Sequence, residues 1–132
     1  MKDEKKVVGY ISCAVWSEEQ CLEQNGVIDL FAARDGVEIS YLYLDCGISG
    51  NSEKPALEML IEDAQKGLIS KVYIKNASRL SRNKELFCSY LVKLLKTEVD
   101  IFFCDEETNA VGIGREWVSS FLIGMLLEKY NI

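Results

Sequence analysis

The sequence turns from a predicted strand to a predicted helix at Lys75-Asn76-Ala77-Ser78-Arg79-Leu80-Ser81-Arg82-Asn83. The two arginines of this turn, Arg79 and Arg82, each carry a planar fork of donors that matches the oxygens of a phosphate group. The first amides of the following helix would add further donors and a favourable dipole. The stretch therefore predicts a phosphate-binding turn, with an ordinary solvated turn as the alternative.

The rest of the chain alternates between apolar runs typical of strands and one-sided patterns typical of helices. Strands are predicted at 7–15, 37–44, 72–74, 100–103 and, at an edge, near 109–111, and helices at 18–35, 55–66, 87–97 and from 115 onward. Ser17, with Gln20 three residues later, has the capping-box spacing and is predicted to cap the helix at 18–35. This alternation predicts an α/β fold with three layers, α/β/α, around a mostly parallel sheet of about four to five strands. We expect one domain over residues 1–132, with functional residues at the carboxyl ends of the strands.

Composition and charge narrow the classes of function. The chain has 132 residues, of which 48% are hydrophobic, so a sizeable core is expected. The formal net charge of −6 argues against binding DNA by bulk electrostatics and leaves room only for a local basic site. No apolar stretch is long enough to span a bilayer, and the N-terminus lacks the apolar run of a signal peptide. We therefore expect a cytoplasmic protein without a membrane segment.

The five cysteines are scattered through the sequence, no Cys-x-x-Cys pair occurs, and the chain has no histidine. This pattern favours neither a zinc site nor a disulfide scaffold, so no metal and no cofactor are expected. The cysteines are predicted to be small hydrophobic residues that are buried or half-buried.

Three segments together resemble the catalytic domain of serine recombinases, the resolvase and invertase family. They are the opening strand with Tyr10 followed by Gln24, the loop Asp45-Cys46-Gly47-Ile48-Ser49-Gly50 with Lys54-Pro55-Ala56-Leu57, and the turn Ser78-Arg79-Leu80-Ser81-Arg82-Asn83. The resemblance implies a resolvase-like fold and DNA strand exchange without a metal ion. In that chemistry a serine after the first strand forms a phosphoserine link to DNA, and arginines stabilise the transition state.

The chain departs from the family at the first strand. The family signature reads Tyr-x-Arg-x-Ser, and the same positions here are Tyr10-Ile11-Ser12-Cys13-Ala14. Ala14 then occupies the nucleophile position and Ser12 the arginine position. A second register, anchored on Ser17, places Trp16 at the nucleophile position. In either register the resemblance implies that the nucleophile is missing.

Other site positions are kept or partly kept. The resemblance implies family-site roles for Tyr10, Gln24 and Asp45, and phosphate binding by Arg79 and Arg82. Phosphate binding is also expected of Lys54, which stands where the family has an arginine and so keeps the charge without the bidentate geometry.

The leading hypothesis is a serine-recombinase domain associated with site-specific DNA recombination that cannot cleave DNA and is retained for subunit association or regulation. The segment from Arg115 to Tyr130 has more apolar residues than one face of a surface helix holds. It is expected to bury its spare face against a second copy of the chain or another recombinase. DNA contact is expected through Arg79 and Arg82, weakly in this chain alone, with no DNA-binding domain among these residues.

Two alternatives stay open. The first is an active recombinase domain in which Ser12 or Ser17 replaces the missing nucleophile. The second is a binding module in which Arg79 and Arg82 hold a small phosphorylated ligand, because one fold can carry unrelated functions.

Overall fold

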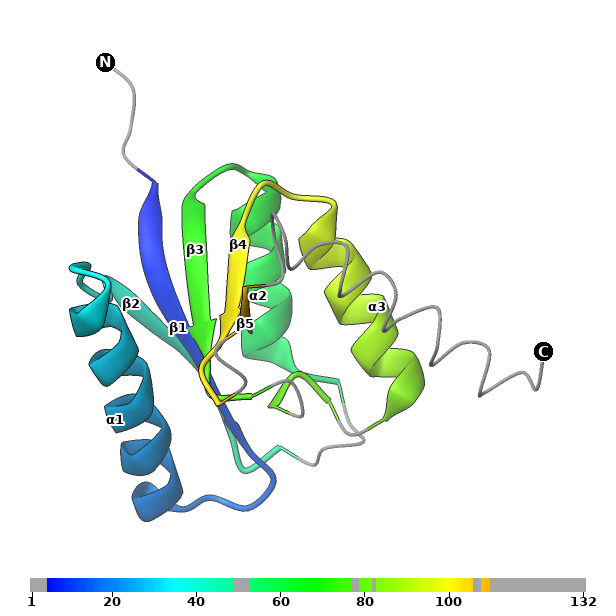
Figure 1. The fold of residues 1–132 in the computed structure, drawn as a ribbon. Helices are drawn as coiled ribbons and strands as arrows, with labels where there is room; N and C mark the ends of the chain where they lie inside the picture. The colour runs from blue at the N-terminus through cyan, green and yellow to red at the C-terminus, as the bar shows by residue number, and fades with distance from the viewer. Residues whose placement is uncertain (1–4, 49–52, 77–78, 82, 106–107, 110–132) are drawn as a thin grey trace.

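Strands and helices alternate along the chain (Figure 1). The structure is a computed structural model that describes residues 5–48, 53–76, 79–81, 83–105 and 108–109. The elements are β1 (Lys6–Cys13), α1 (Glu18–Arg34), β2 (Tyr41–Cys46), α2 (Pro55–Gln65), β3 (Ile69–Ile74), α3 (Lys84–Leu95), β4 (Asp100–Phe103) and β5 (Thr108–Asn109). The predicted α/β fold is confirmed.

The sheet has the strand order β2-β1-β3-β4-β5. The first four strands are parallel to their neighbours, and β5 runs antiparallel to β4. Helix α1 covers one face of this sheet, and α2 and α3 cover the other (Figure 1). The predicted three-layer arrangement around a mostly parallel sheet is therefore correct, and β1 lies between β2 at the edge and β3 at the centre.

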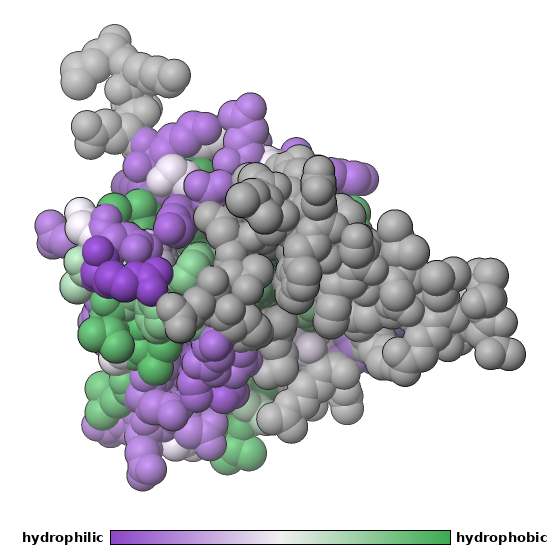
Figure 2. All heavy atoms as spheres, viewed as in Figure 1, coloured by the Kyte–Doolittle hydropathy of each residue, from purple (hydrophilic) through white to green (hydrophobic). Residues whose placement is uncertain are grey.

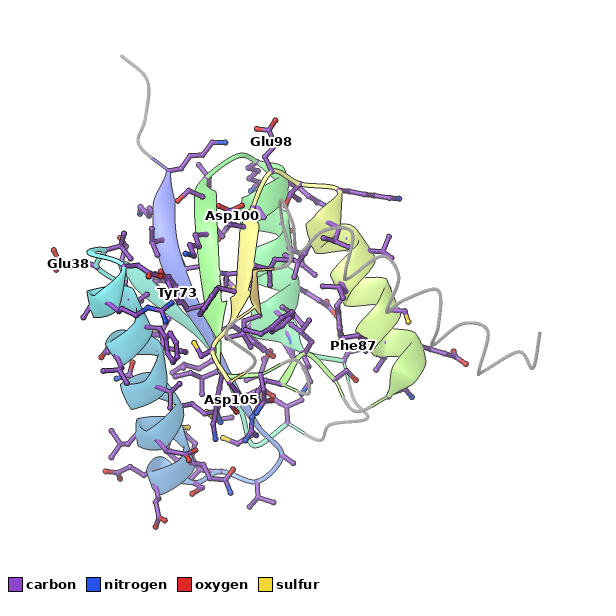
Figure 3. All side chains as sticks on the ribbon, viewed as in Figure 1. Glu38, Tyr73, Phe87, Glu98, Asp100 and Asp105 are labelled. Atoms are coloured by element: carbon purple, nitrogen blue, oxygen red, sulfur yellow. The ribbon has the colours of Figure 1, made fainter. Side chains whose placement is uncertain are left out.

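Side chains alternate between the two faces of each strand and so pack into two separate cores, one on each side of the sheet. On the side of α2 and α3, Tyr10, Val72, Ile74 and Phe103 pack with Leu57, Leu60, Leu91 and Leu94. On the side of α1, Ile11, Tyr73 and Phe102 pack with Ile28 and Ala32. Figure 3 shows Phe87 and Tyr73 pointing toward the sheet and toward α1, respectively. Strand β1 is thus buried on both faces, as its apolar sequence predicts.

Two helices begin at residues whose side chains cap them. The Ser17 hydroxyl accepts a hydrogen bond from the backbone nitrogen of Gln20 at 3.2 Å, at the start of α1. The side chain of Asn83 accepts one from the backbone nitrogen of Leu86 at 3.1 Å, at the start of α3. The predicted cap at Ser17 is confirmed.

The predicted boundaries are wrong at three strands. Strand β2 begins at Tyr41, not at 37, because Val37 and Ile39 pack half-buried in the α1-side core without pairing to β1. Strand β1 ends at Cys13, two residues before the predicted end. Strand β3 begins at Ile69, three residues before the predicted start. The expected edge strand is present as β5 at 108–109.

The helix predicted from Arg115 to Tyr130 lies outside the described residues. Among the helices that are described, none has the length and apolar character needed to cross a membrane. Figure 2 shows hydrophilic and hydrophobic residues interspersed on the described part of the visible face.

Gly9 of β1 lies close to side chains of β2 and α1. A Cβ atom there would stand 2.7 Å from Leu42 Cδ2 and 3.2 Å from Ile28 Cγ2. We predict that Gly9→Val destabilises the fold by about 1–3 kcal/mol through overpacking. Gly26→Ala is the matched control, because a Cβ in that part of α1 meets nothing within 4 Å. It should stabilise the fold by about 0.4–1 kcal/mol. Urea unfolding of both variants measures the two changes in the free energy of unfolding. A Gly9→Val variant as stable as the parent would contradict the close packing of Leu42 and Ile28 around Gly9.

Asp35, just after α1, accepts a hydrogen bond from the Tyr73 hydroxyl at 2.5 Å, and Lys71 Nζ lies 3.5 Å from the same carboxylate oxygen. The hydrogen bond from Tyr73, with a smaller contribution from the charge of Lys71, lowers the pKa of Asp35 below its ordinary 3.8. A lowered carboxyl pKa gives stability that is present above about pH 4 and is lost as pH falls through the folded-state pKa.

We therefore predict that Tyr73→Phe lowers the free energy of unfolding by about 1 kcal/mol at pH 7. The difference from the parent chain should shrink as pH falls below about 4. Chemical denaturation at pH 7 and at successively lower pH measures this. Tyr41→Phe, at an exposed tyrosine, is the control. A difference that stays constant down to acid pH would show that lost packing, and not the hydrogen bond to Asp35, causes the effect.

Candidate functional site

The carboxyl ends of β1 and β2 hold a buried group of polar side chains, which we call the polar cluster: Tyr10, Ser12, Gln24, Asp45 and Lys54. Each of these residues is no more than 4% exposed. In the parallel pairing of the two strands, Ser12 lies opposite Asp45. Gln24 enters from α1 and Lys54 from the start of α2, so four elements meet at one end of the sheet.

Asp45 is the centre of hydrogen bonding within the polar cluster. Its Oδ2 accepts from the Tyr10 hydroxyl at 2.7 Å and from the backbone nitrogen of Leu57 at 3.0 Å, and its Oδ1 accepts from the backbone nitrogen of Ala56 at 2.8 Å. Asp45 thereby caps α2 from the neighbouring strand, where Lys54 at the N-cap position makes no side-chain cap bond. Burial, and then the charge of Asp45, raise the pKa of Tyr10 well above its ordinary value, so Tyr10 remains a hydrogen-bond donor.

Ser12 is bonded through both its side chain and its backbone. Its hydroxyl accepts a hydrogen bond from Lys54 Nζ at 3.0 Å. Gln24 spans its backbone, accepting from the nitrogen at 3.2 Å and donating to the carbonyl at 2.9 Å. Ser12 and Lys54, the two residues at positions where the resemblance expects arginine, therefore contact each other. At 4% exposure, the Ser12 hydroxyl faces the interior of the domain.

The loop between β1 and α1 contains the nucleophile position in both registers considered above. Ala14 is exposed, Val15 is 75% exposed and Trp16 is 65% exposed. None of these side chains has a nucleophilic atom. The one serine of this loop, Ser17, uses its hydroxyl to cap α1. The structure therefore places apolar side chains where the resemblance expects an attacking serine.

Arg79 reaches from the turn after β3 to the end of β1. Its Nη1 donates to the Ser12 carbonyl at 3.2 Å. Its Nε is buried and makes no hydrogen bond within the described part of the chain. A buried donor without a partner is costly, and a phosphate oxygen is the kind of acceptor that a guanidinium prefers. Arg82, the second arginine of the turn, lies outside the described residues.

The acidic side chains near β4 lie at both ends of the sheet. Glu98 and Asp100 lie at the end away from the polar cluster, and Asp105 lies at the same end as the cluster (Figure 3). Asp105 accepts a hydrogen bond from Asn76 Nδ2 at 2.9 Å and so anchors the start of the arginine turn.

Sequence reasoning missed two features. Tyr90 of α3 accepts a hydrogen bond from the backbone nitrogen of Lys54 at 3.0 Å, which fixes the residue that contacts Ser12. Three of the five cysteines also converge: Cys21 Sγ lies 3.5 Å from Cys13 Sγ and 2.8 Å from Cys46 Sγ. The signal was the position of Cys13 and Cys46 at the ends of two strands that proved to be neighbours.

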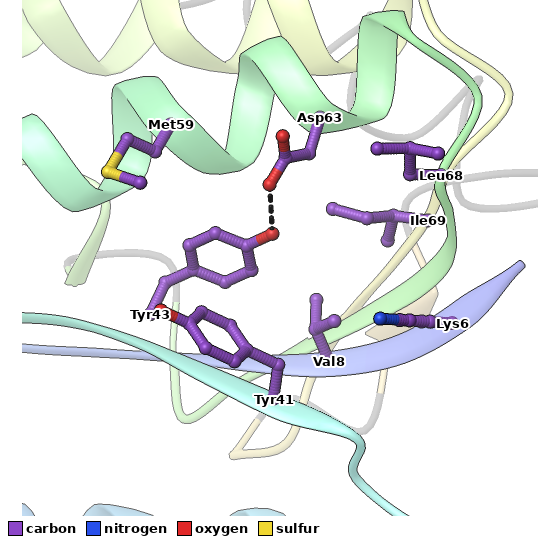
Figure 4. A pocket seen from close by; sticks show the side chains of 8 residues that line it. All are labelled: Lys6, Val8, Tyr41, Tyr43, Met59, Asp63, Leu68 and Ile69. Atoms are coloured by element: carbon purple, nitrogen blue, oxygen red, sulfur yellow. Dashed lines mark hydrogen bonds between the residues drawn. The ribbon is translucent and has the colours of Figure 1, made fainter.

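A separate hollow of about 580 Å³ lies between α2 and the starts of the strands (Figure 4). Its lining includes Lys6, Val8 and Ile69, and Tyr43 donates a hydrogen bond to Asp63 inside it at 2.6 Å. This hollow is at the amino ends of β1 and β3, away from the polar cluster. It contains none of the residues that the sequence singled out.

Comparison with known proteins identifies a family whose match covers most of the chain. The family described as "Resolvase, N terminal domain" matches residues 14–126. A protein of Bacillus subtilis (strain 168) named "Putative DNA recombinase" is 40% identical over 72 residues, which cover 52% of this chain and 14% of that protein. The chain therefore matches only a small part of this relative's length.

Solved structures give the same result for the fold. The N-terminal catalytic domain of TP901-1 integrase superposes with a TM-score of 0.78 at 26% identity, over 96% of each chain. A resolvase family site-specific recombinase from Streptococcus pneumoniae superposes with a TM-score of 0.68 at 19% identity, over 98% of this chain and 100% of that one. With the family match extending over most of the sequence, the chain belongs to the serine recombinase family, as a resolvase-type N-terminal domain.

Proposed function

We propose that this domain takes part in site-specific DNA recombination without cleaving DNA itself, and that it contributes subunit association or regulation to a recombinase assembly. The observation that carries the proposal is the exposed loop after β1, in which Ala14, Val15 and Trp16 offer no nucleophile. An alanine methyl group has no lone pair with which to attack phosphorus, so the covalent step cannot begin there.

The expected costs in rate of losing a charge-stabilising donor and of losing the nucleophile support the proposal that the domain does not cleave DNA. Loss of one charge-stabilising donor, as at Lys54, costs on the order of 10²–10³ in rate, which a slow enzyme tolerates. Loss of a nucleophile costs far more, on the order of 10⁶ where it has been measured in a serine enzyme. The missing serine therefore outweighs the altered arginine.

An active domain with a displaced serine is the rival proposal, and the Ser12–Lys54 contact is the observation in its favour. A lysine that accepts the serine's proton is one known way of activating the hydroxyl; in this structure Lys54 Nζ instead donates to Ser12 Oγ. Against it, Ser12 is 4% exposed and its backbone is held by Gln24 and Arg79, so reaching a DNA phosphate requires the end of β1 to rearrange. Ser17 would have to give up its cap of α1.

The association half of the proposal rests on the segment from Arg115 to Tyr130, whose apolar surplus suits packing against a second copy or another recombinase. The DNA half rests on Arg79, whose buried Nε needs an acceptor. Together they describe a subunit that can join an assembly and hold a phosphate without reacting with it.

The proposal predicts that the covalent intermediate does not form. The protein that contains this domain, mixed with DNA carrying its recombination site, should form no phosphoserine adduct on denaturing gels or by mass spectrometry. A catalytically intact recombinase on its own site is the positive control. An adduct would contradict the proposal. If one forms, loss of the adduct in Ser12→Ala or Ser17→Ala, each tested alone, identifies the displaced nucleophile.

The proposal also predicts that Arg79 contacts a DNA phosphate. Arg79→Ala should weaken duplex DNA binding and reduce the slope of log K against log salt by about 0.9, the value for one lost phosphate contact. Arg79→Lys should keep most of the slope because it keeps the charge. Arg34→Ala is the matched control, since Arg34 stacks on Phe31 away from the polar cluster. Fluorescence anisotropy over a salt series measures all three, and equal slopes for Arg79→Ala and Arg34→Ala would contradict the contact.

A further inference from the structure

Three cysteines from three different elements form a compact group, which we call the thiol cluster: Cys13, Cys21 and Cys46. Their sulfur atoms all lie within 4.8 Å of one another. Cys13 is buried, and Cys21 and Cys46 are half-buried, so the cluster has a protected side and an accessible side. It lies on the α1 face of the sheet, at the same end as the polar cluster.

Regular backbone structure fixes the position of each thiol. Cys13 and Cys46 are register partners at the ends of the neighbouring parallel strands β1 and β2. The Cys13 carbonyl also accepts a hydrogen bond from the nitrogen of Gly47 at 2.9 Å, which locks the two strand ends together. The Cys21 nitrogen donates to the Ser17 carbonyl at 3.0 Å within the first turn of α1. The cluster is therefore built on two strand ends and a helix start, which hold ligands more precisely than loops do.

We propose that the thiol cluster binds one thiophilic metal ion, Zn²⁺ or Cu⁺, through three thiolates. Thiolate ligands select these ions over harder ones. A zinc ion bound to sulfur at about 2.3 Å places its sulfur ligands about 3.8 Å apart. The 3.5 Å pair is already near this spacing, and the 2.8 Å pair reaches it by a small separation of Cys21 from Cys46.

The chemistry of the surroundings fits such an ion. Each thiol loses its proton to the solvent as it binds, so three thiolates and Zn²⁺ leave a net charge of −1 at the site. The positive end of the α1 dipole lies at Cys21 and favours this negative charge. Within the described residues the cluster has no fourth protein ligand, and the chain has no histidine. Zinc would then take its fourth ligand from solvent, whereas Cu⁺ is satisfied by three thiolates.

The ion would join β1, β2 and the start of α1 directly beside Ala14. In this position it acts as a structural staple at the edge of the loop that carries the family's nucleophile position. The inference does not depend on whether the domain cleaves DNA, because the thiol cluster shares no side chain with the polar cluster.

The test uses the reduced, metal-free protein under anaerobic conditions. Zn²⁺ and Cu⁺ are added in separate arms, and native mass spectrometry counts bound ions. Co²⁺ serves as an optical probe of the zinc arm through its sulfur-to-metal charge-transfer absorption. We expect one ion per chain and a melting temperature that rises with metal concentration. If only one of the two ions binds tightly, that ion is identified as the ligand of the thiol cluster.

Cys46→Ser and Cys21→Ser should each lower the affinity by at least about 10-fold and weaken the charge-transfer band. Cys88→Ser, at a half-buried cysteine of α3 outside the cluster, should bind as the parent does. Circular dichroism of the metal-free variants checks that each is folded, and Cys21→Ser is the milder change because Cys21 is half-buried on a helix.

Three results would overturn the proposal. One is a parent protein that binds less than one equivalent of either ion after full reduction. Another is a folded Cys21→Ser or Cys46→Ser variant that binds as tightly as Cys88→Ser. The last is a disulfide between Cys21 and Cys46 in a protein that, after this disulfide is reduced, still binds no metal. That result would make the two cysteines a redox pair.

Discussion

The structure depends on one buried carboxylate. Asp45 is the penultimate residue of β2, and its two oxygens accept hydrogen bonds from the Tyr10 hydroxyl and from the first amides of α2. An ionised carboxylate removed from water costs several kcal/mol unless it is compensated, so all three donors are needed. In return, strand β1, the edge strand β2 and the start of α2 are fixed to one another.

This capping arrangement determines what Lys54 does. Because Asp45 caps α2 from outside the helix, the N-cap residue is not used for that purpose, and its ammonium reaches Ser12 instead. The polar cluster is therefore connected by hydrogen bonds at the two positions where the resemblance expects arginine. Tyr10 and Gln24, which the resemblance assigns to the family site, here hold strand ends and a helix in place.

The features that the sequence predicted well are local ones. The cap at Ser17 and the apolar character of β1 depend on residues near each other in the chain, and both are found in the structure. The start of β2 was misplaced because Val37 and Ile39 are apolar for packing and not for strand pairing. Propensity cannot separate these two reasons for burial.

The contacts that sequence reasoning missed join residues far apart. Lys54 and Ser12 are 42 positions apart, and Cys21 and Cys46 are 25 positions apart. Each contact joins a helix or its cap to the end of a strand, and no local pattern encodes which strand end lies beside which helix. Resemblance to a family supplied the site's positions, but it could not show how the replaced residues would pair with one another.

The exposed loop after β1 also bears on how such a domain can evolve. Ala14 is exposed, and exposed positions outside caps and networks usually change stability by no more than about 0.5 kcal/mol when substituted. A serine and an alanine there would thus be nearly equivalent for folding, whereas Asp45 has no such tolerance. Selection on folding and selection on DNA cleavage therefore act on different residues, and a lineage can abandon the reaction in one step while the scaffold persists unchanged.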